Sequence, residues 1–278
     1  RFSDRATGKK SEFSSGRQVL QIDIDPAEIS KNIPSNNCII GDVKAILQKL
    51  CEKLPAMGHE AWNESVRVMK QDPSNHMDMG PDRLTPQYII ENACGQMAED
   101  EVVATDVGQH QMWTTQYYRF SRPRTFVTSG GLGAMGFGMG SAIGACVASG
   151  KKRTLLFTGD GSFHMNLNEL ATAVSGELPL VIVLLNNCVL GMVRQWQTIF
   201  FEGRYACTTL GRRTDYVKLA ESFGATGLRA ATRQEYDACL EKAFDCRGPV
   251  LIECAVDPDE KVLPMIPPGG SIGEIILR

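Results

Sequence analysis

The sequence predicts an α/β fold in which helices cover both faces of a parallel sheet. From Thr85 onward, segments typical of strands alternate with segments typical of helices, the pattern of a parallel sheet with crossover helices. Residues 180–185 are continuously aliphatic, as expected of a strand buried on both faces. A length of 278 residues fits one large domain or two modest ones, and a hydrophobic content of 43% is ordinary for a globular core.

The first 55 residues are expected to form the tail of a second α/β domain. Residues 18–25 alternate apolar and polar side chains and predict a strand, and Pro26 suits the first turn of a short helix. Residues 37–40 predict a second short strand. Asp42 is placed to cap a following helix, whose apolar side chains fall on one face.

The composition changes after residue 55. Proline, glycine and polar residues dominate up to residue 84, with few aliphatic side chains. We therefore expect a linker over residues 56–82 that contains one exposed helix, followed by a domain over residues 83–278 with a C-terminal tail.

The elements of this second domain follow in regular order. The expected strands cover residues 101–107, 124–128, 153–160, 178–187, 225–229 and 250–256. The expected helices cover residues 85–97, 109–117, 141–149, 166–175, 190–199, 215–223 and 233–245.

Charge and cysteine content exclude several classes of function. A net charge of −3 and a pI near 5.9 leave no basic surplus, so we expect no nucleic-acid partner. No apolar run reaches the roughly 18 residues of a membrane-spanning helix, so we expect no membrane partner. Nine cysteines without a C-x-x-C pair predict reduced thiols and a cytoplasmic location.

A glycine motif suggests one kind of ligand. Residues 131–136 match G-x-G-x-x-G between an expected strand and an expected helix, and Asp160 ends the next strand 24 residues later. This arrangement is close to a dinucleotide-binding fingerprint. A glycine-rich turn between a strand and a helix is common, and it explains the motif without a ligand.

A second pair of motifs points to a metal and a diphosphate. Gly159-Asp160-Gly161 ends one strand, and Asn186-Asn187 ends the next after 24 intervening residues. Parallel strands end at the same edge of the sheet, where ligands bind. A carboxylate and an amide oxygen that meet there suit Mg²⁺, which completes its coordination with phosphate and water. His110 lies on the same edge; a lone histidine is more often a surface or capping residue, but this edge is where a phosphate would bind.

Together these motifs resemble a known family. Gly-Asp-Gly followed by Asn-Asn resembles the diphosphate–magnesium motif of thiamin-diphosphate enzymes. The surrounding segments resemble the large catalytic subunit of acetolactate (acetohydroxyacid) synthases: GQHQMW (108–113), SGGLGAMGFG (129–138), GDGSFHMNLNELATA (159–173), GMVRQW (191–196) and VLPMIPPGG (262–270). RFSDRATGK (1–9), IDIDPAEISKN (22–32) and GDVK (41–44) resemble the central, FAD-binding domain of that family.

The resemblance implies a set of site residues. Mg²⁺ would be held by Asp160, the side chain of Asn187 and the backbone carbonyl of Val189. Thiamin diphosphate would be bound by Val107, Gly108, Gln109, His110, Gly133, Met135, Gly161, Ser162, Gly191 and Met192. Trp196 would line the pocket for the second keto acid, bordered by Met192 and Val193. FAD would contact Arg1, Asp23, Asp42 and Val43, although a strand-end turn and a helix cap explain the two aspartates as well.

The implied activity is the decarboxylation of pyruvate and transfer of the two-carbon unit to pyruvate or 2-oxobutyrate, in branched-chain amino-acid biosynthesis. A homodimer or higher homo-oligomer and a small regulatory subunit are the implied partners. The family's catalytic glutamate lies in an N-terminal domain, so the resemblance covers a C-terminal half. That half would bind FAD weakly and be inactive by itself. Another thiamin-diphosphate 2-keto acid decarboxylase or oxidase, and a cofactor-binding module without turnover, remain as alternatives.

Overall fold

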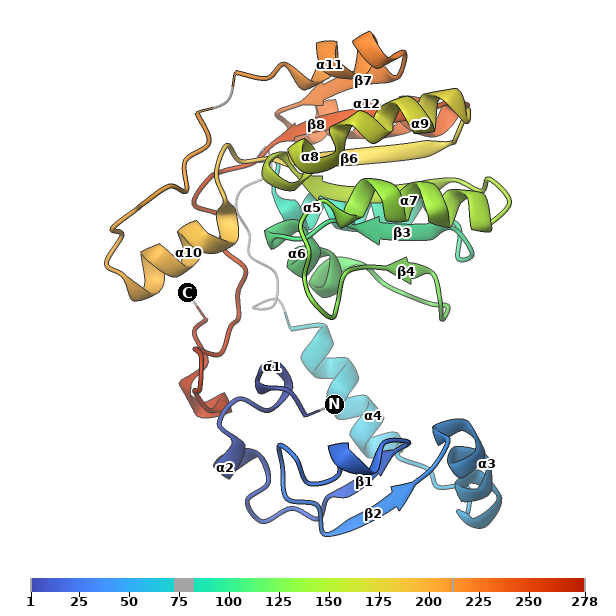
Figure 1. The fold of residues 1–278 in the computed structure, drawn as a ribbon, viewed down its shortest axis with the longest axis vertical. Helices are drawn as coiled ribbons and strands as arrows, with labels where there is room; N and C mark the ends of the chain where they lie inside the picture. The colour runs from blue at the N-terminus through green and yellow to red at the C-terminus, as the bar shows by residue number, and fades with distance from the viewer. Residues whose placement is uncertain (1, 73–82, 212, 278) are drawn as a thin grey trace. The chain divides into compact units, whose positions relative to one another are not determined.

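The computed structural model describes residues 2–72, 83–211 and 213–277 (Figure 1). The chain divides into two compact units, the first comprising residues 1–77 and 263–278 and the second residues 78–262. Among the described helices, none combines the length and the apolar character needed to cross a membrane.

The first unit contains a small parallel sheet and short helices. Strand β1 pairs with β2 in register Leu20↔Asn37. Its elements are α1 (Asp4–Thr7), α2 (Lys10–Phe13), β1 (Leu20–Asp23), η1 (Pro26–Glu28), β2 (Asn37–Ile40), α3 (Val43–Lys53), α4 (Glu60–Lys70) and η4 (Ile272–Glu274). The exposed helix expected in the linker is therefore α4. The apolar face of α3 is partly exposed, since Val43 and Leu47 are 54% and 49% exposed.

The C-terminal tail groups with this first unit, although we expected it with the large domain. The Lys9 amide donates a hydrogen bond to the Gly270 carbonyl at 2.9 Å, and Met265 and Ile276 exchange two backbone hydrogen bonds. The bond from Lys9 joins residues distant in sequence, so no local pattern could indicate it.

The second unit confirms the predicted α/β class. Six parallel strands form one sheet in the order β4-β3-β5-β6-β8-β7 (Figure 1). The strands are β3 (Val102–Thr105), β4 (Phe126–Val127), β5 (Thr154–Gly159), β6 (Leu180–Asn186), β7 (Thr226–Ala230) and β8 (Val250–Ala255). The helices are α5 (Pro86–Gln96), α6 (Gln109–Tyr117), α7 (Phe137–Ala148), α8 (Asp160–Asn166), η3 (Leu167–Glu169), α9 (Leu170–Ser175), α10 (Gly191–Phe200), α11 (Tyr216–Phe223) and α12 (Arg233–Asp245).

Strand β6 shows how the sheet separates two apolar layers. Its residues 180–185 are all buried, and successive side chains point to opposite faces. Val181, Val183 and Leu185 enter the layer formed with α5, α6 and α12. The alternate residues enter the layer formed with α7, α8, α9 and α11. This two-sided burial explains why the strand reads as an unbroken aliphatic run.

The strand order creates a crevice between β3 and β5. From β3 the chain adds β4 on one side and then returns to place β5 on the other. The helices that follow β3 and β5 cover opposite faces, because Trp113 of α6 and Phe163 of α8 lie in different core layers. Ligands of open parallel sheets bind at such a switch point, beyond the carboxyl ends of the strands.

Two helices beside this crevice begin earlier than the sequence predicted. Helix α7 begins at Phe137 instead of 141, because the Asp106 carboxylate accepts hydrogen bonds from the Gly136 and Gly138 amides, each at 2.9 Å. Helix α8 begins at Asp160, directly after β5, whereas we expected a helix only from residue 166. The glycines in these two segments argued against a helix. The Asp106 carboxylate nevertheless starts α7, and α8 continues directly from β5.

Candidate functional site

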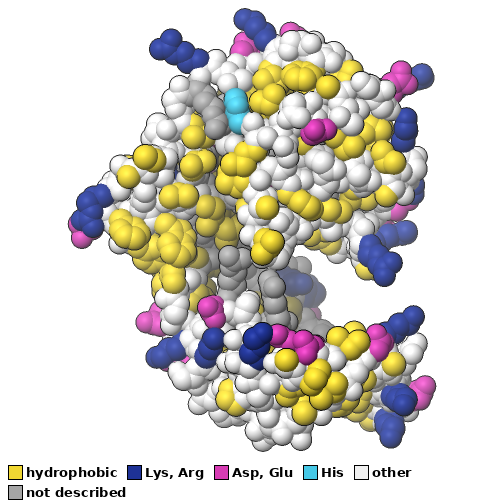
Figure 2. Space-filling model, viewed as in Figure 1, with side chains coloured by type: hydrophobic (Ala, Val, Ile, Leu, Met, Phe, Trp, Pro, Cys, Tyr) yellow, Lys and Arg dark blue, Asp and Glu magenta, His cyan; other side chains and the backbone are white. Residues whose placement is uncertain are grey.

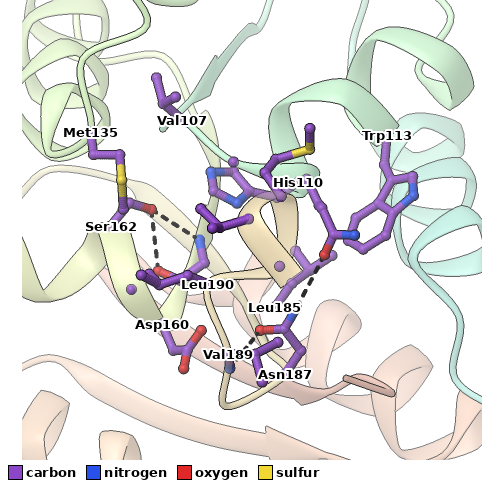
Figure 3. A pocket seen from close by; sticks show the side chains of 17 residues that line it. Val107, His110, Trp113, Met135, Asp160, Ser162, Leu185, Asn187, Val189 and Leu190 are labelled. Atoms are coloured by element: carbon purple, nitrogen blue, oxygen red, sulfur yellow. Dashed lines mark hydrogen bonds between the residues drawn. The ribbon is translucent and has the colours of Figure 1, made fainter. Parts of the chain in front are cut away.

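A pocket lies at the carboxyl edge of β3, β5 and β6, the edge that the motifs predicted (Figure 3). Its cavity measures about 90 Å³, below the roughly 300–1,000 Å³ of pockets that enclose a whole ligand. The predicted site residues that line it are Val107, Gly108, Gln109, His110, Met135, Asp160, Gly161, Ser162, Asn187, Val189, Gly191, Met192 and Val193. Gly133 and Trp196 are not among the residues that line it.

The candidate metal ligands lie together at one side of this pocket. Asp160 is only 3% exposed and is the first residue of α8. The Asn187 side-chain oxygen accepts a hydrogen bond from the Val189 amide at 3.2 Å. Figure 3 shows the side chains of Asp160 and Asn187 on either side of Val189. In the part of the chain that the structure describes, no three His, Cys, Asp or Glu side chains form a metal-binding group. The set therefore consists of one carboxylate and neutral oxygens, which suits Mg²⁺.

The turn after β6 directs the Val189 carbonyl. Val189 forms an isolated antiparallel bridge with Thr209, in which the Leu190 amide donates to the Thr208 carbonyl and the Leu210 amide donates to the Cys188 carbonyl. Val189 and Thr209 are therefore a non-hydrogen-bonded pair of an antiparallel ladder, in which the carbonyl of Val189 accepts no hydrogen bond from the partner strand. Cys188 has a φ of +58°, so the turn is tight and strained for a residue with a side chain. The carbonyl of Val189 is thereby directed away from Thr209, and no described residue of the partner strand donates to it, so it can serve as a ligand.

His110 presents an unsatisfied nitrogen in the pocket. The residue is 5% exposed, and its Nε2 is buried without a hydrogen-bond partner in the described structure. Burial lowers the pKa of His110 to about 3, while a hydrogen bond to the Asp106 carbonyl opposes this shift. That bond uses Nδ1, because Nε2 has no partner. A buried polar atom without a partner is costly, so this nitrogen fits a ligand that would complete it.

The helices around the pocket leave donors for an anion. Helices α6 and α10 begin after Gly108 and Leu190 without a side-chain cap. In the same unit α5, α11 and α12 are each capped by a side chain, those of Thr85, Asp215 and Thr232. The first amides of α6 and α10 are therefore not occupied by a capping side chain, and they lie among the pocket-lining residues.

Glycine is required where side chains pass close to the backbone. A Cβ at Gly191 would lie 1.9 Å from the Gln109 amide oxygen, and one at Gly159 would lie 3.0 Å from His110 Nδ1. The pocket floor thus depends on glycine at the places where these two side chains of α6 reach across it.

The G-x-G-x-x-G motif has a structural explanation within the chain. Gly133 and Gly136 have φ values of +65° and +88°, a region that side chains rarely adopt. Gly136 precedes α7, whose amino end is held by Asp106. Sequence reasoning missed Asp106, which is 1% exposed and whose pKa is raised by burial although three backbone amides hydrogen-bond it. Its signal was an acid at the end of a buried strand.

The candidate substrate residues share one face of α10. Met192 and Val193 line the pocket, and Trp196 lies one turn further along the helix. Trp196 is 39% exposed and packs edge-on against Phe200. Figure 2 shows hydrophobic side chains gathered over α10, where Val193 and Phe201 are 49% and 51% exposed. An apolar surface therefore extends from the pocket along this helix.

The candidate FAD residues lie in the first unit, and each described one has a local role. The Asp23 carboxylate accepts from the Asp25 amide at 3.0 Å in a strand-end turn. Asp42 caps α3 by accepting from the Ala45 amide at 3.0 Å, and Val43 begins that helix. Arg1 lies outside the described residues. Binding of FAD by these residues stays a prediction.

Comparison with known families gives two matches. The family described as "Thiamine pyrophosphate enzyme, C-terminal TPP binding domain" matches residues 106–254, more than half of the chain. The family described as "Thiamine pyrophosphate enzyme, central domain" matches residues 1–50. The first match contains the whole pocket, and the second covers β1, β2 and most of α3.

Curated relatives match along the whole chain. It is 40% identical over 276 residues to "Acetolactate synthase isozyme 2 large subunit" of Escherichia coli, which covers 99% of this chain and 50% of that protein. It is 41% identical over 290 residues to "Acetolactate synthase 2, chloroplastic" of Nicotiana tabacum, covering 99% of this chain and 44% of that protein. It is 38% identical to "Probable acetolactate synthase large subunit" of Methanococcus aeolicus, with 99% and 49% covered. The chain thus spans about half the length of these relatives. By its fold, its pocket and these matches, the chain belongs to the thiamine pyrophosphate enzymes.

Proposed function

We propose that the pocket binds the diphosphate of thiamin diphosphate through a Mg²⁺ ion. The ion would be held by Asp160, the Asn187 side-chain oxygen and the Val189 carbonyl. The observation that carries the proposal is that these three residues follow two adjacent strands and line one pocket. A cation with few protein ligands completes its shell with phosphate oxygens and water.

The residues around the ion fit the rest of the diphosphate. The buried Nε2 of His110 has no partner in the described structure, and a phosphate oxygen would accept a hydrogen bond from it once the ring is protonated. The amides at the start of α6 and α10 can donate to the same anion. The side-chain nitrogen of Gln109 bonds Gln195 and the Glu260 carbonyl, and its oxygen accepts from Asn187, so the backbone amide of Gln109 is the group that it would offer the diphosphate. Gly161, Ser162 and Met135 border the same space.

When bound, thiamin diphosphate supplies an electron sink for carbanion chemistry at a 2-keto acid. The residues of this chain bind and orient it, and they shape the space beside it. Met135 gives that space an apolar wall, and Met192 and Val193 extend the wall toward Trp196. An apolar surface of this kind excludes water and favours a short aliphatic keto acid.

The activity that these features support best is acetolactate synthesis by a catalytic subunit. Pyruvate would donate the two-carbon unit, and pyruvate or 2-oxobutyrate would accept it, as in branched-chain amino-acid biosynthesis. The relatives named as acetolactate synthases over the whole chain support this choice among thiamine pyrophosphate enzymes. A homo-oligomer, a small regulatory subunit, FAD in the first unit and a cytoplasmic location belong to the same proposal.

Calorimetry of cofactor binding tests the metal site. Thiamin diphosphate is titrated into the chain with Mg²⁺ and again with a chelator. We expect binding only with Mg²⁺, and we expect Asp160→Ala to abolish it, because the ion has few protein ligands to lose. The control is Asp100→Ala, since Asp100 precedes β3 at the opposite edge of the sheet. Unchanged affinity in Asp160→Ala would overturn the metal assignment.

A further inference from the structure

Three buried or half-buried carboxamides connect the metal side of the pocket to the end of the second unit. Gln195 of α10 contacts Gln109 of α6, and Gln109 contacts Asn187 after β6 (Gln109 Nε2 to Gln195 Oε1, 3.0 Å; Asn187 Nδ2 to Gln109 Oε1, 3.3 Å). Gln109 and Gln195 are only 4% and 3% exposed. We call Gln195, Gln109 and Asn187 the amide relay. Of the three, only Gln195 was not expected at the site.

Backbone groups determine how the first amide of the relay is turned. The Val262 amide donates to Gln195 Oε1 at 2.8 Å, and Gln195 Nε2 donates to the Val262 carbonyl at 3.0 Å. A backbone N–H can only donate and a backbone carbonyl can only accept. The oxygen and nitrogen of Gln195 therefore cannot exchange places without breaking both bonds.

Gln109 is fixed by the same kind of constraint. Its Nε2 donates to the Glu260 carbonyl at 2.8 Å as well as to Gln195 Oε1. Both amide hydrogens are thus committed to acceptors whose identity is fixed. The Gln109 oxygen is left to face Asn187, and it requires a donor there.

The consequence reaches the candidate ligand. A carboxamide is almost symmetric in shape, so packing alone does not decide whether its oxygen or its nitrogen faces a given direction. Because Gln109 presents an oxygen, Asn187 must turn its nitrogen toward it. The Val189 amide, which can only donate, requires the same orientation, and it donates to the Asn187 oxygen on the opposite side at 3.2 Å. A nitrogen on that side would carry hydrogens and could not bind a cation.

We propose that Gln195 and Gln109 are positioning residues that, together with the Val189 amide, select the oxygen of Asn187 as the metal-facing atom. This role rests on the proposed Mg²⁺–diphosphate site. Gln195 would then affect the affinity for an ion that it does not contact. Partners that orient the direct ligands of a metal typically change its affinity by about 10–100-fold when they are removed.

The first arm of the test measures Mn²⁺, which prefers the same oxygen ligands as Mg²⁺, by electron paramagnetic resonance in the presence of thiamin diphosphate. We expect Gln195→Leu to weaken Mn²⁺ binding by about 10–100-fold. The matched control is Gln111→Leu on α6, the helix that carries Gln109. Gln111 is half-buried and its amide donates to Thr128 Oγ1 at 2.7 Å, outside the amide relay and the turn that carries Val189. Equal losses in the two variants would overturn the inference.

The second arm separates orientation from general support of the fold. Asn187→Asp offers oxygen in both directions and places one oxygen against the Gln109 oxygen, so we expect it to bind Mn²⁺ more weakly. Gln109→Met should weaken binding when residue 187 is the natural asparagine, but it should strengthen binding when it is combined with Asn187→Asp. This reversal of sign is not expected of a residue that only stabilises the fold. Additive losses would overturn the inference, whereas no Mn²⁺ binding by the unsubstituted chain would overturn the proposed metal site and the inference together.

Discussion

At the scale of single residues, the buried ring of His110 could bind an anion, but its burial is energetically unfavourable. Its buried Nε2 has no partner in the described structure, and the neutral ring is enforced by burial, which holds the pKa of His110 at about 3. An exposed histidine in the unfolded chain has a pKa near 6.5. A phosphate oxygen would give this nitrogen a partner and would favour the protonated ring.

The pKa of His110 predicts a dependence of stability on pH. Below pH 6.5 the unfolded chain binds a proton at His110 that the folded chain does not. The contribution of His110 to the free energy of unfolding is therefore fully present above that pH and is lost as the pH falls toward 3. Lowering the pH from 7.5 to 5.5 should cost about 1.4 kcal/mol through this residue. Urea unfolding at both pH values, compared between the unsubstituted chain and His110→Gln, measures it. Identical pH dependence in the two proteins would contradict the assignment.

Single residues of the site were predictable where the signal was local. Asp160 and Asn187 follow strands in short motifs, and both line the pocket. Asp106 and Gln195 were not found, because their partners are far away in sequence: Gly136 is 30 residues from Asp106, and Gln109 is 86 residues from Gln195. The sequence around a buried polar residue does not indicate which distant group it will contact.

At the scale of elements, α7 shows how a distant side chain decides where a helix begins. Asp106 draws the helix start back into a glycine-rich segment that local propensity leaves unstructured. The same local reasoning missed α8, which follows β5 without a loop. The longer elements, such as β6 and α12, were predicted well because their periodicity and caps lie within them.

The glycines of α7 give a matched pair of stability predictions. A Cβ at Gly140 would meet no atom within 4 Å, so Gly140→Ala should stabilise the protein by roughly 0.5–1 kcal/mol through reduced backbone entropy. A Cβ at Gly138 would lie 2.7 Å from the Asp106 side chain, so Gly138→Ala should destabilise it. Thermal unfolding of both variants tests the difference. Equal shifts would show that Asp106 does not hold the start of α7.

Helix α10 carries a prediction about substrate choice. Trp196 lies one turn beyond the pocket-lining residues Met192 and Val193. In an active enzyme that contains this chain, Trp196→Leu should change the preference between pyruvate and 2-oxobutyrate, which differ by one methylene. Such a contact contributes about 1–3 kcal/mol, or roughly 10–200-fold. The product ratio from mixed substrates measures it, and an unchanged ratio would remove Trp196 from the acceptor site.

At the scale of the whole molecule, the strand order places the site. The sequence predicted that the strands end at one edge, but not that β5 lies beside β3 with β4 on the far side. That order depends on packing between distant segments. This strand order creates the switch point between β3 and β5, where the following helices pack on opposite faces of the sheet and where the pocket lies.

The pocket also predicts how the chain behaves by itself. Among the described residues that line it, only Asp160 and His110 are acidic or basic, and none is a glutamate. Its volume of about 90 Å³ leaves room for part of a cofactor. We therefore expect the 278-residue chain to form acetolactate from pyruvate at least about 100-fold more slowly than a full-length relative, the typical contribution of acid–base assistance. Colorimetric assay of acetolactate measures this, and comparable rates would contradict it.

The position of the metal ion decides whether the proposed site exists. Crystals of the chain grown with thiamin diphosphate and Mn²⁺ would locate the ion by its anomalous scattering. We expect one peak bound by Asp160, the Asn187 side-chain oxygen and the Val189 carbonyl, with a phosphate oxygen completing its shell. A bound cofactor whose ion lies elsewhere, or whose diphosphate lies on the glycine segment 131–136, would contradict the proposed site.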